Sequence, residues 1–246
     1  MRSLRRGVVG ILVSGVVGLL AVGCAAPAAP ATGVRLPAIV GSNMVLQAGA
    51  PVPIWGWGGT GGQVTVSVAG QSKSAIVAAD GRWKVVLDRL AASDKPVKVT
   101  VKGANEIVLD NVLIGEVWAG SGQSNMQWGV GGSANGKADV AAANYPKMRL
   151  FLVPTIVSPT PSDDVNGRWV ECSPATAGEF SAALYYFGRH LHEELKTPVG
   201  LIASSWGGTL IEPWIPLAGL EGAAELKALA DQAKSAPAQA GPGHPV

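Results

Sequence analysis

The spacing of the apolar residues changes once along this chain of 246 residues, and this change constrains the fold more than any other feature. Between residues 34 and 110 apolar and polar residues alternate, as in QVTVSV (63–68) and PVKVTV (96–101). A period of two gives a strand one buried face and one face in water. Asp80-Gly81 separates two further strand-like runs and supplies the positive φ that a tight hairpin needs. We therefore expect a small β-sandwich over residues 34–110.

After residue 111 the apolar runs become continuous. The runs VLIGEVW (112–118), MRLFLV (148–153) and VGLIAS (199–204) are apolar at most positions. Strands that are buried on both faces have this composition, and helical patterns separate the three runs. The predicted fold class is therefore α/β, with the β-sandwich followed by a flavodoxin-like parallel-sheet domain over residues 111–236.

The helix before the third run has the clearest signals. Thr176 and Glu179 have the spacing of a capping box, and Thr197-Pro198 ends the pattern. Its apolar residues recur every three or four positions, at Phe180, Leu184, Phe187, Leu191 and Leu195. A further helical pattern follows from residue 217, and the Gly/Pro-rich residues 237–246 predict a disordered tail. Three strands are few for such a sheet, so we expect the domain to be truncated.

The first 23 residues are typical of an export signal. Residues 1–6 are positively charged, residues 7–23 are apolar, and Cys24 follows small residues. The pattern resembles a bacterial lipoprotein signal, after which Cys24 would carry lipid and residues 24–33 would form an Ala/Pro-rich linker. An uncleaved membrane anchor is the alternative, because these 17 apolar residues reach the lower limit for spanning a bilayer. We expect an exported protein that is lipid-anchored to the bacterial cell envelope.

The composition limits the partners of the chain. An apolar fraction of 48% with 15% charged residues is typical of a globular protein. Loss of residues 1–23 would remove three arginines and leave 16 basic and 17 acidic residues, so nucleic acid is not an expected partner. With Cys24 lipidated, Cys172 has no disulfide partner, and we expect neither a metal nor another cofactor.

Two Gly-rich turns follow the first and the third continuous run. The first contains Gly122 and Ser124, and the second contains Gly207 and Gly208. In open α/β sheets the sites lie beyond the carboxyl ends of the strands, so both turns are predicted at one edge. Gly122 would permit the tight turn that exposes Ser124, and the amides of Ser124 and of Gly207 or Gly208 would form an oxyanion hole. The pattern indicates acyl transfer, although Gly-x-Ser turns are also common without this chemistry.

Seven stretches of the chain occur together, in this order and spacing, in one family of enzymes. They are SNMVLQ, PVPIWGWGG, DGRWKVVL, GEVWAGSGQSNMQW, FSAALYYFGRHLHEEL, TPVGLI and SWGGTLIEPW. Over residues 34–216 the chain therefore resembles the sialate O-acetylesterase family of carbohydrate esterases, which are SGNH/GDSL-type hydrolases. The stretches GQSNM and SWGGTxIExW together are more specific for this family than either stretch alone.

The resemblance implies roles for several residues. Ser124 is the implied nucleophile, Gln123 and Asn125 shape its turn together with Gly122, and the turn 207–209, which ends at Thr209, carries an oxyanion-hole amide. The implied reaction is the hydrolysis of an acetyl ester on a sugar through an acetyl-serine intermediate. Its implied substrates are sialic acid and other acetylated carbohydrates.

The chain lacks two blocks with which members of this family continue, a Tyr-Gln-Gly-Glu-type block and an Asp-x-x-His motif that supplies the general base. His190 and His192 lie on the flanks of the predicted helix and His244 lies in the tail, and none has an acid three positions before it. We therefore expect no general base in this chain, and weak or absent hydrolysis. The alternative function is that of a non-catalytic, lipid-anchored remnant that binds glycans.

Four tryptophans are predicted near the same edge of the sheet, namely Trp118, Trp128, Trp206 and Trp214. Tryptophan rings stack on sugars, and they also fill cores. We interpret Trp118 as a packing residue, and both interpretations stay open for Trp128 and Trp206. Asp163-Asp164 is expected in a turn without a catalytic role, and Cys172 is expected to be a semi-buried, unreactive residue.

Overall fold

The computed structural model describes residues 33–156, 158 and 161–235, which belong to one compact unit of the chain. The predicted signal segment 1–23, Cys24, nearly all of the linker 24–33 and the predicted tail 237–246 with His244 lie outside the described residues. Among the described helices, none is both long enough and apolar enough to cross a membrane.

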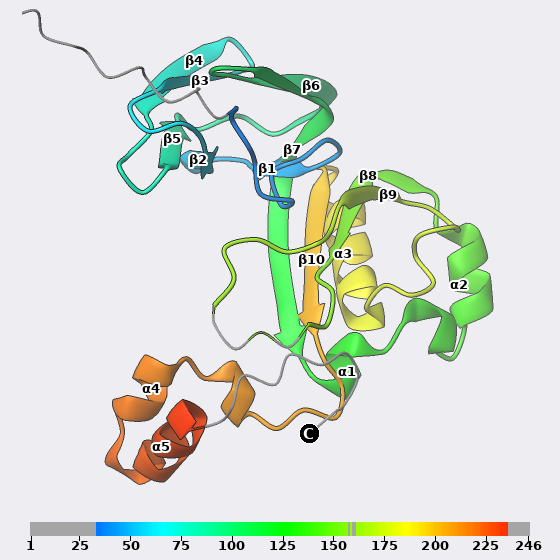
Figure 1. Ribbon diagram of the computed structural model, residues 1–246. Helices are drawn as coiled ribbons and strands as arrows, with labels where there is room; N and C mark the ends of the chain where they lie inside the picture. Colours follow the sequence, from blue (N-terminus) through cyan, green and yellow to red (C-terminus); the bar gives the residue numbers. More distant parts are fainter. Residues whose placement is uncertain (1–32, 157, 159–160, 236–246) are drawn as a thin grey trace, which may run out of the picture. The chain divides into compact units, whose positions relative to one another are not determined.

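The described residues form ten strands and eight helical segments (Figure 1). The strands are β1 (Val45–Gln47), β2 (Val52–Trp57), β3 (Gln63–Val68), β4 (Gln71–Ile76), β5 (Arg82–Leu87), β6 (Ser93–Lys102), β7 (Glu106–Gly122), β8 (Tyr145–Leu152), β9 (Trp169–Cys172) and β10 (Val199–Ser205). The helical segments, of which those marked η are 3₁₀ helices, are α1 (Ser124–Gln127), η1 (Val130–Gly132), α2 (Gly136–Ala142), α3 (Ala182–Leu195), η2 (Glu212–Trp214), α4 (Leu217–Glu221), η3 (Ala224–Leu226) and α5 (Lys227–Ser235).

The strand β7 connects the two parts of the main sheet. Seven strands form one path in the order β4-β3-β6-β7-β10-β8-β9, β1 adds to β7, and β2 pairs with β5 in a separate sheet. The first part of β7 pairs with β6 in an antiparallel ladder, and its last part, from Glu116 to Gly122, pairs with β10 in a parallel ladder. The predicted boundary between residues 110 and 111 therefore falls inside one continuous strand of 17 residues.

The parallel sheet predicted from the continuous apolar runs is confirmed. The strands β7, β8 and β10 run parallel, and β10 lies between the other two. The sequence did not indicate β9, which pairs with β8 in an antiparallel ladder at the edge of this sheet. A strand of four residues is too short to show a period, which explains the omission.

Two apolar cores lie on opposite faces of β8. Phe151 and Trp169 join the core that fills the space between the two sheets of the first part of the chain. Leu150 joins a second core, in which α3 packs on the parallel sheet through Leu184 and Tyr185. Because successive residues of a strand point to opposite faces, the short strand β8 contributes to both cores.

The prediction that Asp80-Gly81 closes a hairpin is wrong, as the strand pairing shows. Gly81 has a φ of +78° and the turn closes through a hydrogen bond from the Ala78 N–H to the Arg82 carbonyl. The strands on its two sides nevertheless belong to different sheets, because β4 pairs with β3 and β5 pairs with β2. The turn therefore connects two sheets, and local turn chemistry alone does not specify which strands pair.

The start of α3 also differs from the prediction. The helix is capped by Ser181, whose Oγ accepts a hydrogen bond from the Leu184 N–H. The Thr176 hydroxyl instead donates to the carbonyl of Glu171, so the expected capping box with Glu179 does not form. The helix begins at Ala182, so Ser181 is the residue placed to cap its first turn, and the amide that it satisfies is that of Leu184 and not that of Glu179.

The face of α3 that is buried differs from the face predicted from its large apolar residues. Phe187 and Leu195 are 39% and 55% exposed, whereas Tyr185 and Gly188 are buried. A side chain at Gly188 would begin 2.5 Å from a methyl carbon of Leu201, so the glycine allows the helix to approach β10 closely. This close approach, which the spacing of large apolar residues does not reveal, determines the face that packs.

A buried arginine on β8 joins the first part of the chain to the parallel sheet. The Arg149 guanidinium donates to the carbonyl and side-chain oxygens of Asn43 and of Asn111 and to the carbonyl of Pro146, at 2.8–3.3 Å. It also forms an ion pair with Glu171 at 3.4 Å. Burial lowers the pKa of Arg149, and the Glu171 carboxylate acts in the opposite direction. Asn43 and Asn111 both have a positive φ, which these hydrogen bonds help to hold.

We expect Arg149→Met to lower the free energy of unfolding by about 3 kcal/mol, because it leaves buried acceptors without their donor. Lys147→Met on the same strand is the matched control, since Lys147 forms only a surface ion pair with Asp94. Denaturant unfolding of both variants measures the difference. Equal stability of the two variants would contradict the importance of the Arg149 network.

Candidate active site

Ser124 lies at the point where β7 ends and α1 begins. Gly122, the last residue of β7, has a φ of +147°, and a side chain there would begin 3.0 Å from Met126. Its carbonyl accepts a hydrogen bond from the Trp206 N–H at 2.9 Å, which ties the end of β7 to the turn after β10. The local sequence therefore turns the chain sharply and leaves Ser124 exposed at the carboxyl edge of the sheet.

The turn after β10 lies next to Ser124, as the sequence predicts. A side chain at Gly207 would begin 3.2 Å from the Ser124 Oγ and 2.7 Å from the Gln127 Oε1. The Ser124 hydroxyl itself lies 3.5 Å from the Gln123 Oε1, which is a weak interaction. The two Gly-rich turns therefore meet at one place, although they are about eighty residues apart in the sequence.

The amide of Gly207 is already occupied by a side chain that sequence reasoning missed. Its N–H donates to the Gln127 Oε1 at 2.6 Å. The Gly208 N–H and the Ser124 N–H donate to no other described residue, and Gly208 has a φ of +78° with open space around its Cα. Gln127 follows Ser124 by three residues, about one helical turn. This spacing is the sequence signal that could have identified Gln127 as a residue of the site. The oxyanion-hole role of the three amides stays a prediction.

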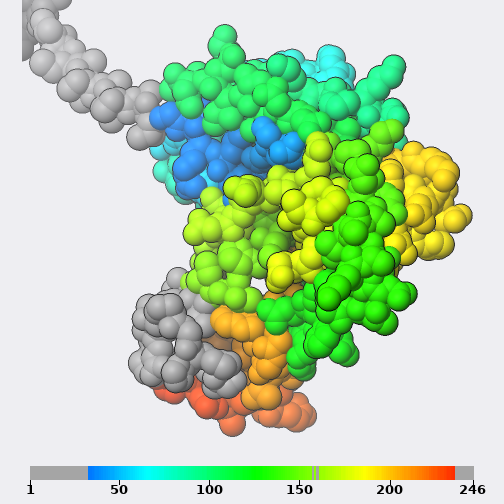
Figure 2. Space-filling view, turned by 90° about the vertical axis from the view of Figure 1, so that its right-hand side faces the viewer, coloured from blue at the N-terminus to red at the C-terminus, as the bar shows by residue number. Residues whose placement is uncertain are grey.

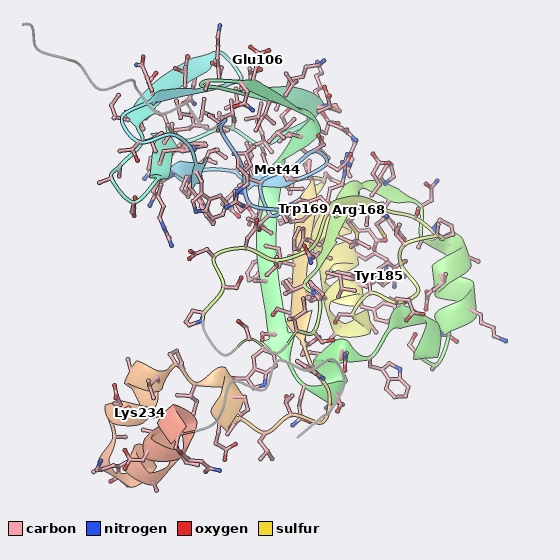
Figure 3. All side chains as sticks on the ribbon, in the orientation of Figure 1. Met44, Glu106, Arg168, Trp169, Tyr185 and Lys234 are labelled. Atoms are coloured by element: carbon pink, nitrogen blue, oxygen red, sulfur yellow. The ribbon has the colours of Figure 1, made fainter. Side chains whose placement is uncertain are left out.

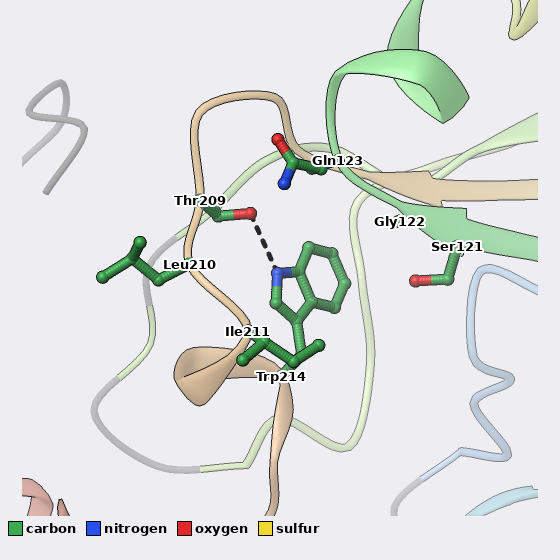
Figure 4. Close-up of a pocket in the computed structure, with 7 residues that line it drawn as sticks. All are labelled: Ser121, Gly122, Gln123, Thr209, Leu210, Ile211 and Trp214. Atoms are coloured by element: carbon green, nitrogen blue, oxygen red, sulfur yellow. Dashed lines mark hydrogen bonds between the residues drawn. The ribbon is translucent and has the colours of Figure 1, made fainter.

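A small cavity borders the turn that carries Ser124 (Figure 4). It has a volume of about 270 Å³ and is lined by uncharged residues, namely Ser121, Gly122, Gln123, Thr209, Leu210, Ile211 and Trp214. The Thr209 hydroxyl donates to the Trp206 carbonyl at 2.7 Å and accepts from the Trp214 indole N–H at 2.9 Å. Thr209 thus holds the turn after β10 and orients one wall of the cavity.

Neither described histidine contacts Ser124. The His192 Nδ1 forms a hydrogen bond with the Thr197 carbonyl at 2.7 Å, beyond the end of α3, and His190 is exposed on the same helix. The described residues contain no cluster of acidic, histidine or cysteine side chains that could hold a metal ion. Cys172 is buried, and burial raises the pKa of its thiol to about 12, so its thiolate is scarce at neutral pH.

The four tryptophans differ in exposure and contacts. Trp128 is 60% exposed, and Trp206 is half-buried beside Gly207. Trp118 contacts the ring of Phe187 edge-on at 5.1 Å, but it remains 44% exposed. Asn125, which the resemblance assigned to the turn, is exposed and forms no side-chain hydrogen bond with another described residue. Trp128 therefore offers the most open ring near the turn.

The acidic pair in the loop between β8 and β9 has structural partners. Asp163 forms an ion pair with Arg82, and Asp164 pairs with Arg35 and accepts the Ala38 N–H at 2.8 Å. Figure 2 shows this yellow-green loop region beside the blue residues near the start of the described chain. The loop is thereby attached to the first part of the chain, on the carboxyl side of β8.

The fold and the site together define the class of this protein. A mostly parallel α/β sheet that carries an exposed serine in a Gly-Gln-Ser-Asn turn is consistent with an SGNH-like fold, and the predicted fold class is confirmed. The structure is similar to the crystal structure of a carbohydrate acetylesterase from Xanthomonas citri, with a TM-score of 0.74 and 36% sequence identity. The similarity covers 79% of this chain and 45% of that chain.

The chain is also similar to curated proteins of a narrower class. The chain is 36% identical over 205 residues to the sialate O-acetylesterases of Mus musculus and Homo sapiens, which covers 74% of this chain. No protein-family model matches the chain. The chain is therefore homologous to the sialate O-acetylesterases, and the resemblance predicted from its motifs is confirmed. The aligned region spans 37% and 39% of the length of these two relatives.

We expect Gln127→Leu to loosen the turn after β10, because the variant keeps the size of the side chain but removes the acceptor of the Gly207 N–H. Hydrogen exchange of a peptide covering residues 203–210 should become faster, and the free energy of unfolding should fall by about 1 kcal/mol. Gln123→Leu is the control, since its carboxamide makes only the weak contact with Ser124. Unchanged exchange in the Gln127 variant would show that this hydrogen bond does not hold the turn.

Proposed function

We propose that this chain carries the nucleophile and part of the oxyanion hole of a carbohydrate esterase that removes O-acetyl groups from sialic acid or other acetylated sugars. The observation that carries the proposal is the meeting of Ser124 with the Gly207 turn at the carboxyl edge of the sheet. The activities after which the relatives are named, sialate O-acetylesterase and carbohydrate acetylesterase, support the same reaction.

The proposed chemistry has two steps. The Ser124 oxygen forms a bond with the acetyl carbonyl carbon while its proton leaves to a base, and the sugar oxygen departs with a proton. The negative charge on the carbonyl oxygen is stabilised by the free amides of Ser124 and Gly208, and by that of Gly207 after Gln127 moves away. Water then attacks the acetyl-serine and releases acetate.

We further propose that this chain by itself turns over acetyl esters only weakly. Proton transfer from Ser124 requires a base within hydrogen-bond reach, and His192 is held at the end of α3 by Thr197. If no base reaches Ser124, as among the residues that the structure describes, the oxyanion hole and binding supply a residual acceleration of roughly 10³ to 10⁴ over water. Hydrolysis of the acetyl-serine also needs an activated water. The acetyl-serine should therefore form faster than it is hydrolysed, and it should accumulate.

The test is to incubate the full chain with 4-nitrophenyl acetate and to measure its intact mass and its peptides by mass spectrometry. We expect one acetyl group to accumulate on Ser124 and to be absent from Ser124→Ala. Ser121→Ala is the matched control, because Ser121 is also exposed and lines the cavity beside the turn, whereas the serine hydroxyl next to Gly207 is that of Ser124. Acetylation spread over Ser121 and the surface lysines, or no acetylation at all, would contradict the assignment of Ser124 as the nucleophile.

A non-catalytic glycan-binding protein is the second candidate function. The exposed ring of Trp128 favours it, because open tryptophan faces stack on sugar rings. If Ser124 takes no acetyl group, while Trp128→Ala abolishes binding of an acetylated glycan in a titration, this second function replaces the first.

We also propose that the chain is exported and attached to the cell-envelope membrane through lipid on Cys24. The support is the sequence of residues 1–24, a charged segment followed by an apolar segment and a cysteine. In a bacterial host, Cys24→Ser should lose incorporated palmitate and move from the detergent phase to the aqueous phase. Cys172→Ser should leave both properties unchanged, since Cys172 is buried in the fold. Palmitate retained by the Cys24 variant would rule out this anchor.

A further inference from the structure

The side chain of Gln127 occupies a backbone donor beside Ser124 that the carbonyl oxygen of an ester would need. The Gly207 N–H donates to the Gln127 Oε1 at 2.6 Å. The same Oε1 and the Ser124 Oγ lie 2.7 Å and 3.2 Å from the position where a Gly207 side chain would begin. A carbonyl oxygen of the protein itself is therefore bound next to the serine hydroxyl.

The place of Gln127 follows from the short helix α1. Ser124 begins this helix of four residues and Gln127 ends it, and the Gln127 N–H donates to the Gln123 carbonyl at 2.9 Å. Residues three apart on a helix are neighbours on its surface, so both side chains reach the turn after β10. Figure 3 shows α1 at the end of the sheet where β7 and β10 terminate, away from the region in which Tyr185 packs.

A neighbouring cavity gives the Gln127 carboxamide a second place. The cavity has a volume of about 460 Å³, and Gln127 lines it together with Thr155, Glu179 and Ser205, whereas Gly207 does not. The hydroxyls and the carboxylate of these residues offer hydrogen-bond partners to a carboxamide. Gln127 is exposed, and the bond to Gly207 is its one side-chain hydrogen bond within the described part of the chain. Turning into the cavity therefore breaks one hydrogen bond and unpacks no core residue.

The reaction changes the strength of the competitor for the Gly207 amide. The carbonyl oxygen of a bound ester is neutral, like the Gln127 Oε1, so it displaces the carboxamide without a gain in hydrogen-bond strength. The oxygen of the tetrahedral intermediate is charged, and hydrogen bonds to a charged acceptor are about twice as strong. The Gln127 carboxamide should therefore leave the amide as the charge develops, and its departure lowers the rate of the step.

A purely structural role for Gln127 makes the opposite prediction. If its hydrogen bond only holds the turn after β10, loss of the bond displaces the Gly207 and Gly208 amides and slows the reaction. The sign of the change in rate therefore distinguishes the two roles.

We propose that Gln127 is a self-blocking side chain, which we call the Gln127 plug. It closes the Gly207 donor of the oxyanion hole in the free protein, and it opens this donor by turning into the neighbouring cavity. This inference rests on the proposed function and adds a regulation of the same site.

The test follows the acetylation of Ser124 in the full chain by 4-nitrophenyl acetate. The Ser124 Oγ takes the acetyl group, 4-nitrophenolate leaves, and the serine proton passes to the buffer. We expect Gln127→Ala to raise the second-order rate constant of this step, measured by intact mass, about two-fold to ten-fold, the usual effect of one neutral hydrogen bond. Gln127→Asn should also react faster, because its oxygen lies one carbon closer to the backbone and falls short of the Gly207 N–H.

Gln71→Ala is the matched control. The Gln71 Oε1 also accepts a backbone N–H, that of Asp88 at 2.8 Å, but Gln71 lies on β4 in the first part of the chain. This variant should be acetylated at the rate of the unmodified chain. If Ser124 of the unmodified chain is acetylated and both Gln127 variants are slower or unchanged, the plug is overturned and the esterase proposal remains.

A second measurement does not depend on catalysis. Sodium acetate supplies a charged oxygen for the same amides, and its binding to the isotope-labelled chain can be followed through the amide signal of Gly207. We expect Gln127→Ala to reach half-saturation at an acetate concentration about two-fold to ten-fold lower than the unmodified chain, with sodium chloride at equal ionic strength as the reference. Equal midpoints, or no movement of the Gly207 signal in either chain, would overturn the plug. Tighter acetate binding by the variant without acetylation of Ser124 in any chain would leave the plug in place and refute the esterase.

Discussion

The hydrogen bonds of the Arg149 guanidinium join parts of this protein that are distant in sequence. They fix Asn43 before β1, Asn111 in the middle of β7 and Glu171 on β9, around one charge that is almost fully buried. Asn111 has a positive φ inside a strand, and such a conformation persists only where its surroundings hold it. Asn111 lies within the antiparallel ladder with β6, two residues before β7 gains its first parallel partner, β1, at Leu113, so the course of the strand toward Ser124 depends on the same network.

The site depends on a second junction at the other end of β7. The Trp206 N–H binds the Gly122 carbonyl, Gln127 binds Gly207, and Thr209 binds both Trp206 and Trp214. These contacts draw the turn after β10 onto the turn that carries Ser124.

Much of the fold was predictable because its signals are local. The continuous apolar runs identified β7, β8 and β10, since burial on both faces requires apolar residues throughout. The cap of α3 was misplaced by five residues, because Thr176 and Ser181 are both capable of capping and only their contacts distinguish them. The turn at Gly81 was recognised, but its role between two sheets was not, because strand pairing depends on distant residues.

The sequence by itself determined the strands β7, β8 and β10, the turn at Ser124 and the resemblance to sialate O-acetylesterases, because the signal for each of these lies in residues that are close together in the sequence. The tertiary structure decided that β10 lies between β7 and β8 and that Gln127 occupies the Gly207 amide. The physical reason is the range of the interactions. Periodicity and turn chemistry act over a few residues, whereas these contacts join residues that are brought together only when both apolar cores are packed.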